Sequence, residues 1–176
     1  MTGFEITPLS HSPAIRRMLG EILVEVVAAG GSVSFMHPLD QATAEAFWQD
    51  SLSAAERGER IILGAWKGDL LVSTVTLQLS LPPNQPHRAE IAKMMTRPRH
   101  RGGGMASALL QAAETLAVEH GRTMLVLDTA SDEGASGFYE RMGFTLAGEI
   151  PDYALKPHGG LTGTKIFWKR IEPRSL

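Results

Sequence analysis

The pattern of apolar and polar residues predicts a strand, a turn and a helix around the middle of the chain. Residues 89–96 form an apolar-leaning run, and Pro98 ends it because proline has no amide hydrogen for a sheet ladder. Three consecutive glycines follow at 102–104. Behind them, apolar residues recur at helical spacing up to His120, and Gly121 is a typical helix stop. We therefore predict that this helix begins at the glycines.

The flanking segments predict the other elements of an α/β protein. Apolar stripes of helical period at 15–27 and 44–55 follow Ser12 and Asp40, which are typical N-cap residues. Shorter β-type runs and turn signals predict strands at 4–9, 61–66, 70–81, 123–128, 145–150 and 164–169, a short helix at 133–142, and loops at 81–86 and 151–163. The strands at 89–96 and 123–128 are joined through a helix, so we expect them to be parallel.

Length and composition indicate one globular domain. A chain of 176 residues is long enough for a substantial core, and we expect a single domain over 1–176. The hydrophobic fraction of 43% and the charged fraction of 20% favour neither disorder nor a membrane protein. No apolar run approaches the roughly 20 residues of a membrane span, and the first residues lack the order of a signal peptide. We expect a cytoplasmic protein with no membrane partner.

Charge and cysteine content exclude several classes of function. A net charge of −2 and a pI near 6.3 argue against a nucleic-acid partner. The absence of cysteine excludes disulfides, thiolate metal sites and a cysteine nucleophile, so acyl transfer would go directly to the acceptor. The histidines form no local ligand pair, and no metal is expected.

The glycine turn at 102–104 is the strongest candidate for a binding site. A helix start has unpaired N–H groups and a positive dipole end, and glycines let a phosphate approach closely. A P-loop is excluded because Gly-Lys-Ser/Thr is missing, and a dinucleotide loop because Ser107 stands in place of its third glycine. The basic residues before the turn either bind phosphate or form a solvated loop; they are Arg97, Arg99, His100 and Arg101. The alternative for the turn itself is an ordinary helix cap.

The motif Arg101-x-x-Gly104-x-Ala106, which is followed by two leucines at 109 and 110, resembles the coenzyme A pyrophosphate loop of the GNAT superfamily of N-acetyltransferases. Residues 138–144, FYERMGF, resemble the second signature of the family and lie downstream of Asp128. The resemblance implies an α/β fold with a mixed, mostly antiparallel sheet, a central parallel strand pair that splays apart, and flanking helices. It also implies acetyl-CoA as co-substrate, held by Met94, Met95, Thr96, Arg101, Gly102, Gly103, Gly104, Met105, Ala106 and Ser107.

A closer resemblance, over nearly the whole chain, is to the tabtoxin resistance acetyltransferases. It rests on Ser32-Val33, Phe35-Met36, Leu39-Asp40, Arg88-Ala89-Glu90, Leu127-Asp128-Thr129, Gly148-Glu149 and Pro157. It implies an acceptor pocket shaped by Phe35, Met36, Asp40 and Tyr153, although Phe35 and Met36 are alternatively buried wedges between helices. Many superfamily members have Asn where this chain has Asp132, so a cofactor contact there is not expected.

Acetyl transfer to an amine needs a deprotonated amine and a proton for the departing thiolate. By the resemblance, Tyr139 is the proton donor, since a phenol of pKa about 10 can protonate a thiolate of pKa about 8.5. Glu90 and Asp128 are candidate bases, although they fall at opposite ends of neighbouring parallel strands. The alternatives are a packing role for Tyr139, a rim charge for Glu90 and a turn cap for Asp128.

We therefore predict an acetyl-CoA-dependent GNAT N-acetyltransferase, an acyltransferase that moves acetyl directly to the amine of a small molecule. A tabtoxin-like toxin or an antibiotic is the favoured acceptor, because two carboxylates suit an ammonium and bulky side chains would close a peptide groove. The alternatives are a non-catalytic acyl-CoA binding or sensing module and a protein N-terminal acetyltransferase. The oligomeric state is open, with a homodimer as one alternative.

Overall fold

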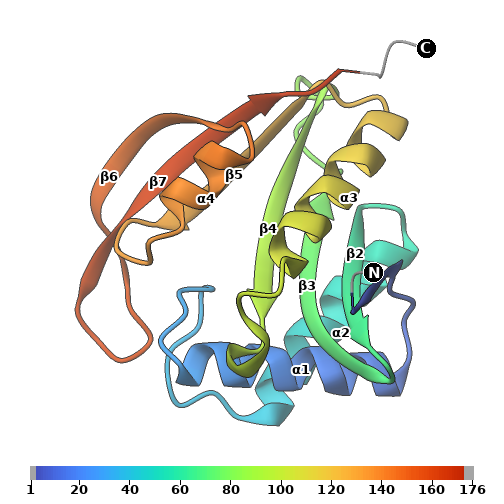
Figure 1. The fold of residues 1–176 in the computed structure, drawn as a ribbon, viewed down its shortest axis with the longest axis vertical. Helices are drawn as coiled ribbons and strands as arrows, with labels where there is room; N and C mark the ends of the chain where they lie inside the picture. The colour runs from blue at the N-terminus through green and yellow to red at the C-terminus, as the bar shows by residue number, and fades with distance from the viewer. Residues whose placement is uncertain (1–2, 173–176) are drawn as a thin grey trace.

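A computed structural model describes residues 3–172 and contains a seven-stranded sheet with helices on both faces (Figure 1). In chain order the elements are β1 (Glu5–Pro8), α1 (Pro13–Ala28), α2 (Gln41–Glu56), β2 (Arg60–Lys67), β3 (Leu70–Gln78), β4 (Arg88–Thr96), the 3₁₀ helix η1 (Pro98–His100), α3 (Met105–Glu119), β5 (Met124–Ala130), α4 (Ser136–Arg141), β6 (Thr145–Leu155) and β7 (Leu161–Arg170). The predicted extent of the domain, 1–176, includes terminal residues outside the described part and stays a prediction.

The strand order is β1-β2-β3-β4-β5-β7-β6. Only β4 and β5 pair in parallel, and all other neighbours are antiparallel. The predicted fold class, a mixed and mostly antiparallel sheet with one central parallel pair, is confirmed. Because β4 and β5 are joined through α3, their parallel pairing is the crossover that the sequence pattern predicts.

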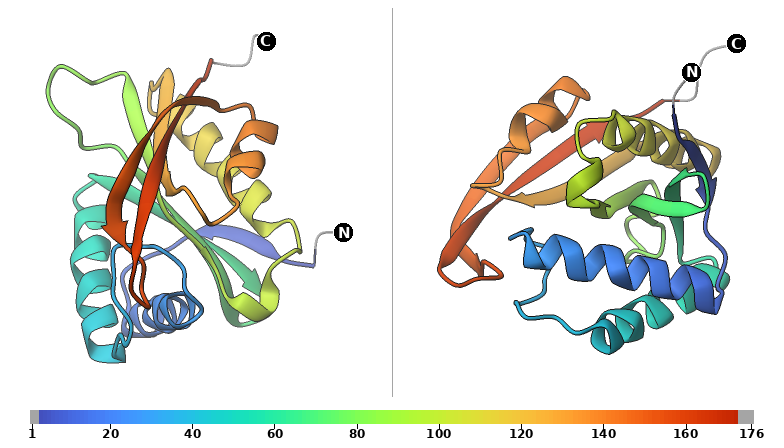
Figure 2. Two further views of the ribbon diagram at one scale, coloured as in Figure 1. Left: turned by 90° about the vertical axis from the view of Figure 1, so that its left-hand side faces the viewer. Right: turned by 60° about the horizontal axis from the view of Figure 1, so that its bottom comes forward.

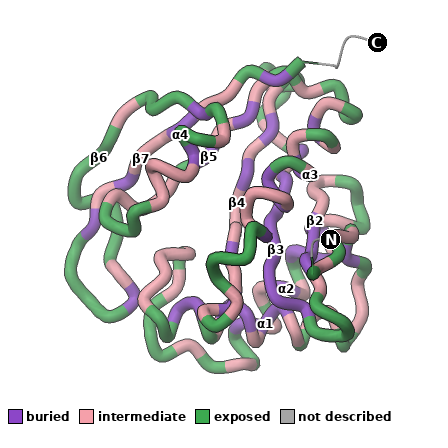
Figure 3. The backbone as a smooth tube through the Cα atoms, viewed as in Figure 1, coloured by how far each residue is buried: buried purple, intermediate pink, exposed green. Residues whose placement is uncertain are grey.

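The helices divide into two layers, which Figure 2 shows on opposite sides of the sheet. α1 and α2 bury one hydrophobic cluster, which includes Leu23 and Trp48. α3 and α4 bury another, which includes Leu109 and Phe167. The central strand β3 is buried along nearly its whole length, as the colours of Figure 3 show. The two layers hold the central strands rigidly, so a break between these strands makes a fixed site.

The predicted helix ends are largely confirmed. The hydroxyl of Ser12 accepts a hydrogen bond from the amide of Ile15 at 3.1 Å and caps α1. The carboxylate of Asp40 accepts one from the amide of Thr43 at 2.7 Å and caps α2. α3 ends at Glu119, two residues before Gly121, whose φ of +74° is readily adopted by glycine.

The hairpin formed by β6 and β7 corrects the sequence prediction. We expected a loop at 151–163, but β6 continues through Pro151 to Leu155, and only residues 156–160 form the turn. β6 is an edge strand, where proline is tolerated, and its register with β7 shifts between Ile150 and Ala154. The predicted helix at 133–142 is also shorter than expected, since α4 begins at Ser136.

Candidate active site

The sheet opens between β4 and β5, which meet at one end and diverge towards the other (Figure 1). Their register runs from the pair Arg88 and Met124 to the pair Glu90 and Val126, and stops there. Beyond this point β4 pairs only with β3, with a register shift opposite Val75 and a φ of +49° at Lys93. This bulge turns β4 away from β5. The opening is a cleft of about 550 Å³.

The glycine turn forms one end of the cleft. Gly104 is the N-cap of α3 and has a φ of +80°, a conformation that glycine adopts without strain. No side chain caps this helix end. The first N–H groups of α3 therefore have no intrahelical acceptor and remain available to an anion. Every residue predicted to bind the coenzyme lines this same cleft: Met94, Met95, Thr96, Arg101, Gly102, Gly103, Gly104, Met105, Ala106 and Ser107.

Arg97 does not belong to the cationic turn as the sequence suggested. Its side chain is only 8% exposed and turns towards α1, where it donates to Glu25 at 2.7 Å and to Glu21 at 3.0 Å. It also donates to the carbonyl of Leu71 at 2.8 Å. Arg97 therefore ties the end of β4 to α1, and among the predicted cations His100 and Arg101 line the cleft.

Tyr139 lies at the wall of the cleft and is 8% exposed. Its ring packs against the rings of Phe138, Phe144 and Phe167, and its hydroxyl donates to the sulfur of Met94 at 3.9 Å. Burial, with smaller contributions from the charges of Asp128 and Glu133, raises the pKa of Tyr139 to about 12. The hydroxyl therefore keeps its proton at neutral pH and acts as a hydrogen-bond donor.

The two predicted carboxylates have different surroundings. Asp128 lines the cleft and accepts a hydrogen bond from the hydroxyl of Thr164 at 3.4 Å. Glu90 lies beside Val126 in the paired part of the strands and forms an ion pair with Arg88 at 2.6 Å. Glu90 is not among the residues that line the cleft. Of the two, Asp128 is the carboxylate that a substrate in the cleft would meet.

The residues expected to shape the acceptor pocket are not brought together at the cleft. Phe35 packs edge-on against Phe47, with ring centroids 5.3 Å apart. Met36 is 45% exposed, so it is not a buried wedge between helices. Asp40 caps α2, and Tyr153 is 59% exposed on β6. None of the four predicted residues lines the cleft.

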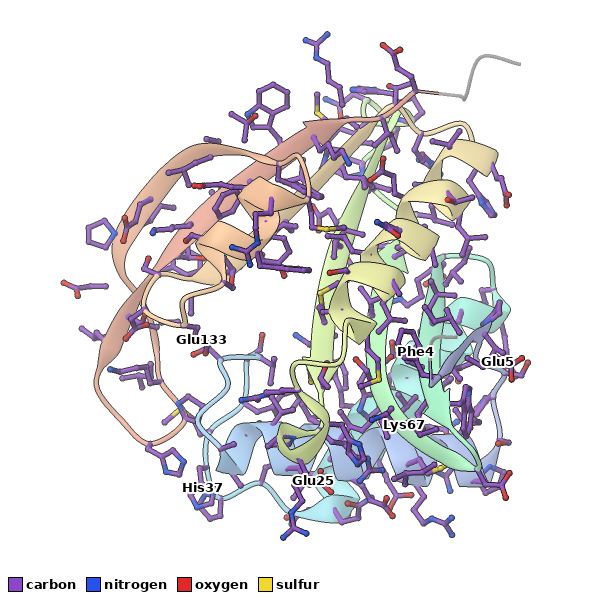
Figure 4. All side chains as sticks on the ribbon, in the orientation of Figure 1. Phe4, Glu5, Glu25, His37, Lys67 and Glu133 are labelled. Atoms are coloured by element: carbon purple, nitrogen blue, oxygen red, sulfur yellow. The ribbon has the colours of Figure 1, made fainter. Side chains whose placement is uncertain are left out.

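Further polar residues line the cleft: Ser32 belongs to the segments that carry the closer resemblance, whereas the sequence reasoning gave no role to Ser34, Lys93 or Glu133. The loop between α1 and α2 brings Ser32 and Ser34 to the cleft, β4 brings Lys93, and the segment before α4 brings Glu133. Glu133 accepts a hydrogen bond from the amide of Ser32, and Figure 4 shows it pointing towards this loop. Lys93 is the one signal that the sequence offered, because a lysine inside a central strand is unusual.

The α1–α2 loop is also fastened to the β6–β7 turn. The amide of His37 donates to the carbonyl of Pro157 at 2.9 Å, and the rings of His37 and His158 lie 4.4 Å apart. His158 also hydrogen-bonds to the carbonyl of Ala28 at 2.9 Å. These contacts connect the α1–α2 loop, whose residues Ser32 and Ser34 line the cleft, to the turn between β6 and β7.

Asp132 forms hydrogen bonds within the protein. Its carboxylate accepts hydrogen bonds from Thr162 and, at 3.2 Å, from Lys156. These bonds, with that from Thr162 as the larger cause, lower the pKa of Asp132.

None of the helices within residues 3–172 has the length and apolar character that a membrane span requires. The same part of the chain contains no group of three or more His, Asp or Glu side chains suited to a metal ion.

The fold and the turn at the start of α3 define an acetyltransferase. Residues 31–144 match the Acetyltransferase (GNAT) family, and the chain belongs to this family of N-acetyltransferases.

Solved structures share the fold over nearly their whole length. A ribosomal-protein-alanine N-acetyltransferase from Brucella melitensis is 18% identical, with a TM-score of 0.77 over 94% of this chain and 99% of that chain. A Salmonella typhimurium protein solved with its cofactor acetyl-CoA is 16% identical, with a TM-score of 0.74 over 97% and 96%. An aminoglycoside 6'-N-acetyltransferase complexed with coenzyme A is 16% identical, with a TM-score of 0.73 over 98% and 99%. At these identities the likeness establishes the fold, and not the acceptor.

Proposed function

We propose that this acetyltransferase moves the acetyl group of acetyl-CoA directly to the amine of a small, amino-acid-like molecule. The observation that carries the proposal is the composition of one cleft. Its glycine turn, at the start of α3, suits a pyrophosphate, while Tyr139 and Asp128 suit the proton transfers of amide formation. A coenzyme bound in this cleft and an amine entering beside Asp128 would meet at the divergence of β4 and β5.

The residues of the cleft fit the coenzyme. Apart from its chain neighbours, no described atom lies within 4 Å of the position that a Cβ at Gly104 would take, so the turn leaves space for a ligand. His100 and Arg101 offer cations beside the turn. The edge of β4 at residues 94–96 is unpaired on the side of β5, so its backbone can bond to the amides of pantetheine. Two similar structures contain acetyl-CoA or coenzyme A.

Tyr139 and Asp128 would have complementary roles. An amine must lose a proton to attack the thioester, and Asp128 is the carboxylate placed to accept it, directly or through water. Tyr139, with a pKa of about 12, holds its proton more tightly than a thiol, whose ordinary pKa is about 8.5. The hydroxyl is therefore suited to donate a hydrogen bond to the departing sulfur, and full proton transfer would follow only as charge builds there.

A small acceptor is favoured by the loop between α1 and α2, which lines part of the cleft. The α1–α2 loop is bonded to the β6–β7 turn through His37 and Pro157 and to Glu133 through Ser32. A loop held in this way would restrict the space that a polypeptide needs. The resemblance to the tabtoxin resistance acetyltransferases supports an amino-acid-like toxin or antibiotic as the acceptor. A ribosomal-protein and an aminoglycoside acetyltransferase both share the fold, so the fold alone does not choose between acceptor classes.

A competition assay tests the proposal. Tabtoxinine-like amino acids, polyamines, aminoglycosides and peptides with free N-termini are offered in equal amounts with acetyl-CoA, and mass spectrometry identifies the acetylated products. We expect acetylated amino acids and little acetylated peptide. If peptide N-termini dominate the products and small amines stay unmodified, the chain is a protein N-terminal acetyltransferase and the proposal is wrong.

A further inference from the structure

Lys93 is a cation in the cleft that neither the glycine turn nor the proton transfers account for. Its ammonium group donates to the hydroxyl of Ser34 at 3.2 Å and lies 5.6 Å from the centre of the Phe47 ring. Within the described residues, no carboxylate lies within 4.0 Å of it. An ammonium has three donors, and this one uses a single donor on a neutral partner.

Lys93 and Asp128 both lie just beyond the point where the pairing of β4 and β5 ends, and both line the cleft. The last parallel pair joins Glu90 to Val126, so Lys93 comes three residues beyond the divergence on one strand and Asp128 two residues beyond it on the other. At about 3.3 Å per residue, both groups lie at a similar depth along the cleft. Burial lowers the pKa of Lys93, and the charge of Asp128 partly offsets this. Within the described residues the two groups line the same cleft without forming an ion pair.

The neighbouring loop offers an unused hydroxyl. Ser32 lines the cleft, and its buried Oγ has no hydrogen-bond partner among the described residues. Ser34, which holds Lys93, has a φ of +77°, a conformation that few residues other than glycine adopt. Buried polar groups normally have partners, so an unpaired hydroxyl and an ammonium with unused donors in the same cleft indicate a ligand with hydrogen-bond acceptors.

The opposite charges of Lys93 and Asp128 should discriminate between kinds of amine substrate. A polyamine would bring further positive charge towards Lys93 and be repelled. A simple monoamine would satisfy Asp128 and leave Lys93 partly desolvated without an anion. A zwitterion satisfies both groups, because its ammonium faces the carboxylate of Asp128 while its carboxylate faces the ammonium of Lys93.

We propose that Lys93, assisted by the hydroxyls of Ser32 and Ser34, binds the carboxylate of the acceptor and makes the enzyme selective for α-amino acids. This inference rests on the small-acceptor function proposed above and names the chemical class of that acceptor. It also predicts that uncharged amides and polycations of similar size are poor substrates.

The test compares carboxylates with matched carboxamides. A panel of free L-α-amino acids, each paired with its carboxamide, is assayed with acetyl-CoA for kcat/KM. We expect the wild-type protein to prefer the carboxylate at least tenfold. Lys93→Met keeps most of the length of the side chain and removes its charge. In this variant, kcat/KM for the carboxylate should fall at least tenfold while that for the carboxamide changes less than threefold. Lys93→Arg should retain most of the preference.

Two controls keep the outcomes distinct. Lys67→Met removes an exposed lysine at the end of β2, outside the cleft, and should change neither substrate. Thermal unfolding and coenzyme A calorimetry on Lys93→Met should match the wild-type values. If coenzyme affinity falls and both substrates decline together, Lys93 serves the coenzyme and the inference is wrong.

Failure of the inference differs from failure of the proposed function. If acids and amides are acetylated equally well, the acceptor is still a small, amino-acid-like amine and only the role of Lys93 is refuted. If no free amino acid or amide is acetylated while peptides are, the small-acceptor proposal fails and the inference fails with it.

Discussion

Tyr139→Phe is the most direct test of the proposed chemistry, because it removes one hydroxyl and leaves the ring in place. The ring would keep its contacts with Phe138, Phe144 and Phe167 at centroid distances of 5.1, 5.9 and 5.8 Å. The hydroxyl donates only to the sulfur of Met94 at 3.9 Å, and a thioether is a weak acceptor. We therefore expect the free energy of unfolding at neutral pH to change by about 1 kcal/mol or less.

The expected kinetic effect is much larger. A hydrogen bond to a charged group contributes about 1.5–3 kcal/mol, and the departing thiolate acquires its charge only as the reaction proceeds. Losing this bond should lower kcat by about 10- to 150-fold. Coenzyme A affinity should change only a few fold, because the bond strengthens in the transition state rather than on binding.

Steady-state thiol release between pH 6 and pH 10 and calorimetry with coenzyme A provide the measurements. Because the pKa of Tyr139 is about 12, its ionisation should produce no break in the wild-type rate profile over this range. The second tyrosine provides a comparison: Tyr153→Phe changes an exposed side chain outside the cleft and should leave the kinetics unchanged. Unchanged turnover of Tyr139→Phe at every pH would remove Tyr139 from the mechanism.

Three further outcomes are expected. Gly104→Asp should weaken coenzyme A binding severely in calorimetry, because its carboxylate would meet the pyrophosphate. The neutral variant Gly104→Asn, whose side chain tolerates the same φ of +80°, should bind coenzyme A much better. Equal affinities of the two variants would argue against the turn as the phosphate site. Arg97→Met should lower the free energy of unfolding in urea by about 2–3 kcal/mol, since it breaks the bonds to Glu21 and Glu25, while coenzyme affinity changes only a few fold. The folded-state pKa of Tyr139, about 12, exceeds the ordinary value of 10.0, so its stabilising contribution is complete below pH 10 and is lost as the pH rises towards 12. Urea unfolding at pH 9 and pH 11 should show a loss that is smaller in Tyr139→Phe.

The part of the cleft where we propose that the coenzyme binds could be outlined from the sequence because it is local. The strand at 89–96, the glycines at 102–104 and the helix behind them are consecutive in the chain. The chemistry of this part also depends on backbone groups at a helix start, whose position follows from the hydrophobic period and the glycines alone. All ten residues predicted for the coenzyme consequently line the same cleft.

Elements whose form depends on distant partners were predicted less well. Pro151 and the glycines near 160 resemble a loop, but an edge strand with a register shift tolerates such residues, so β6 and β7 extend further than the sequence indicated. In the sequence, Arg97 looks like part of a phosphate-binding cluster of basic residues. Only the packing of α1 against the end of β4 reveals that Arg97 forms ion pairs with Glu21 and Glu25 instead. No local pattern encodes these pairings.

In the part of the cleft where we propose that the acceptor binds, the sequence indicated Asp128, whereas the roles of Ser34, Lys93 and Glu133 could not be predicted for the same reason. Ser32 and Ser34, Lys93, Asp128 and Glu133 come from separate segments and meet only because the bulge at Lys93 turns β4 away from β5. A change of residue in any one of these segments alters the charge that an acceptor meets, without disturbing the glycine turn or the sheet. The likeness to solved structures at 16–18% identity establishes the fold and does not identify the acceptor. The acceptor therefore has to be inferred from the charged side chains of the cleft. Among these, Lys93 is the one that neither the glycine turn nor the proposed proton transfers explain, so it is the best guide to the acceptor.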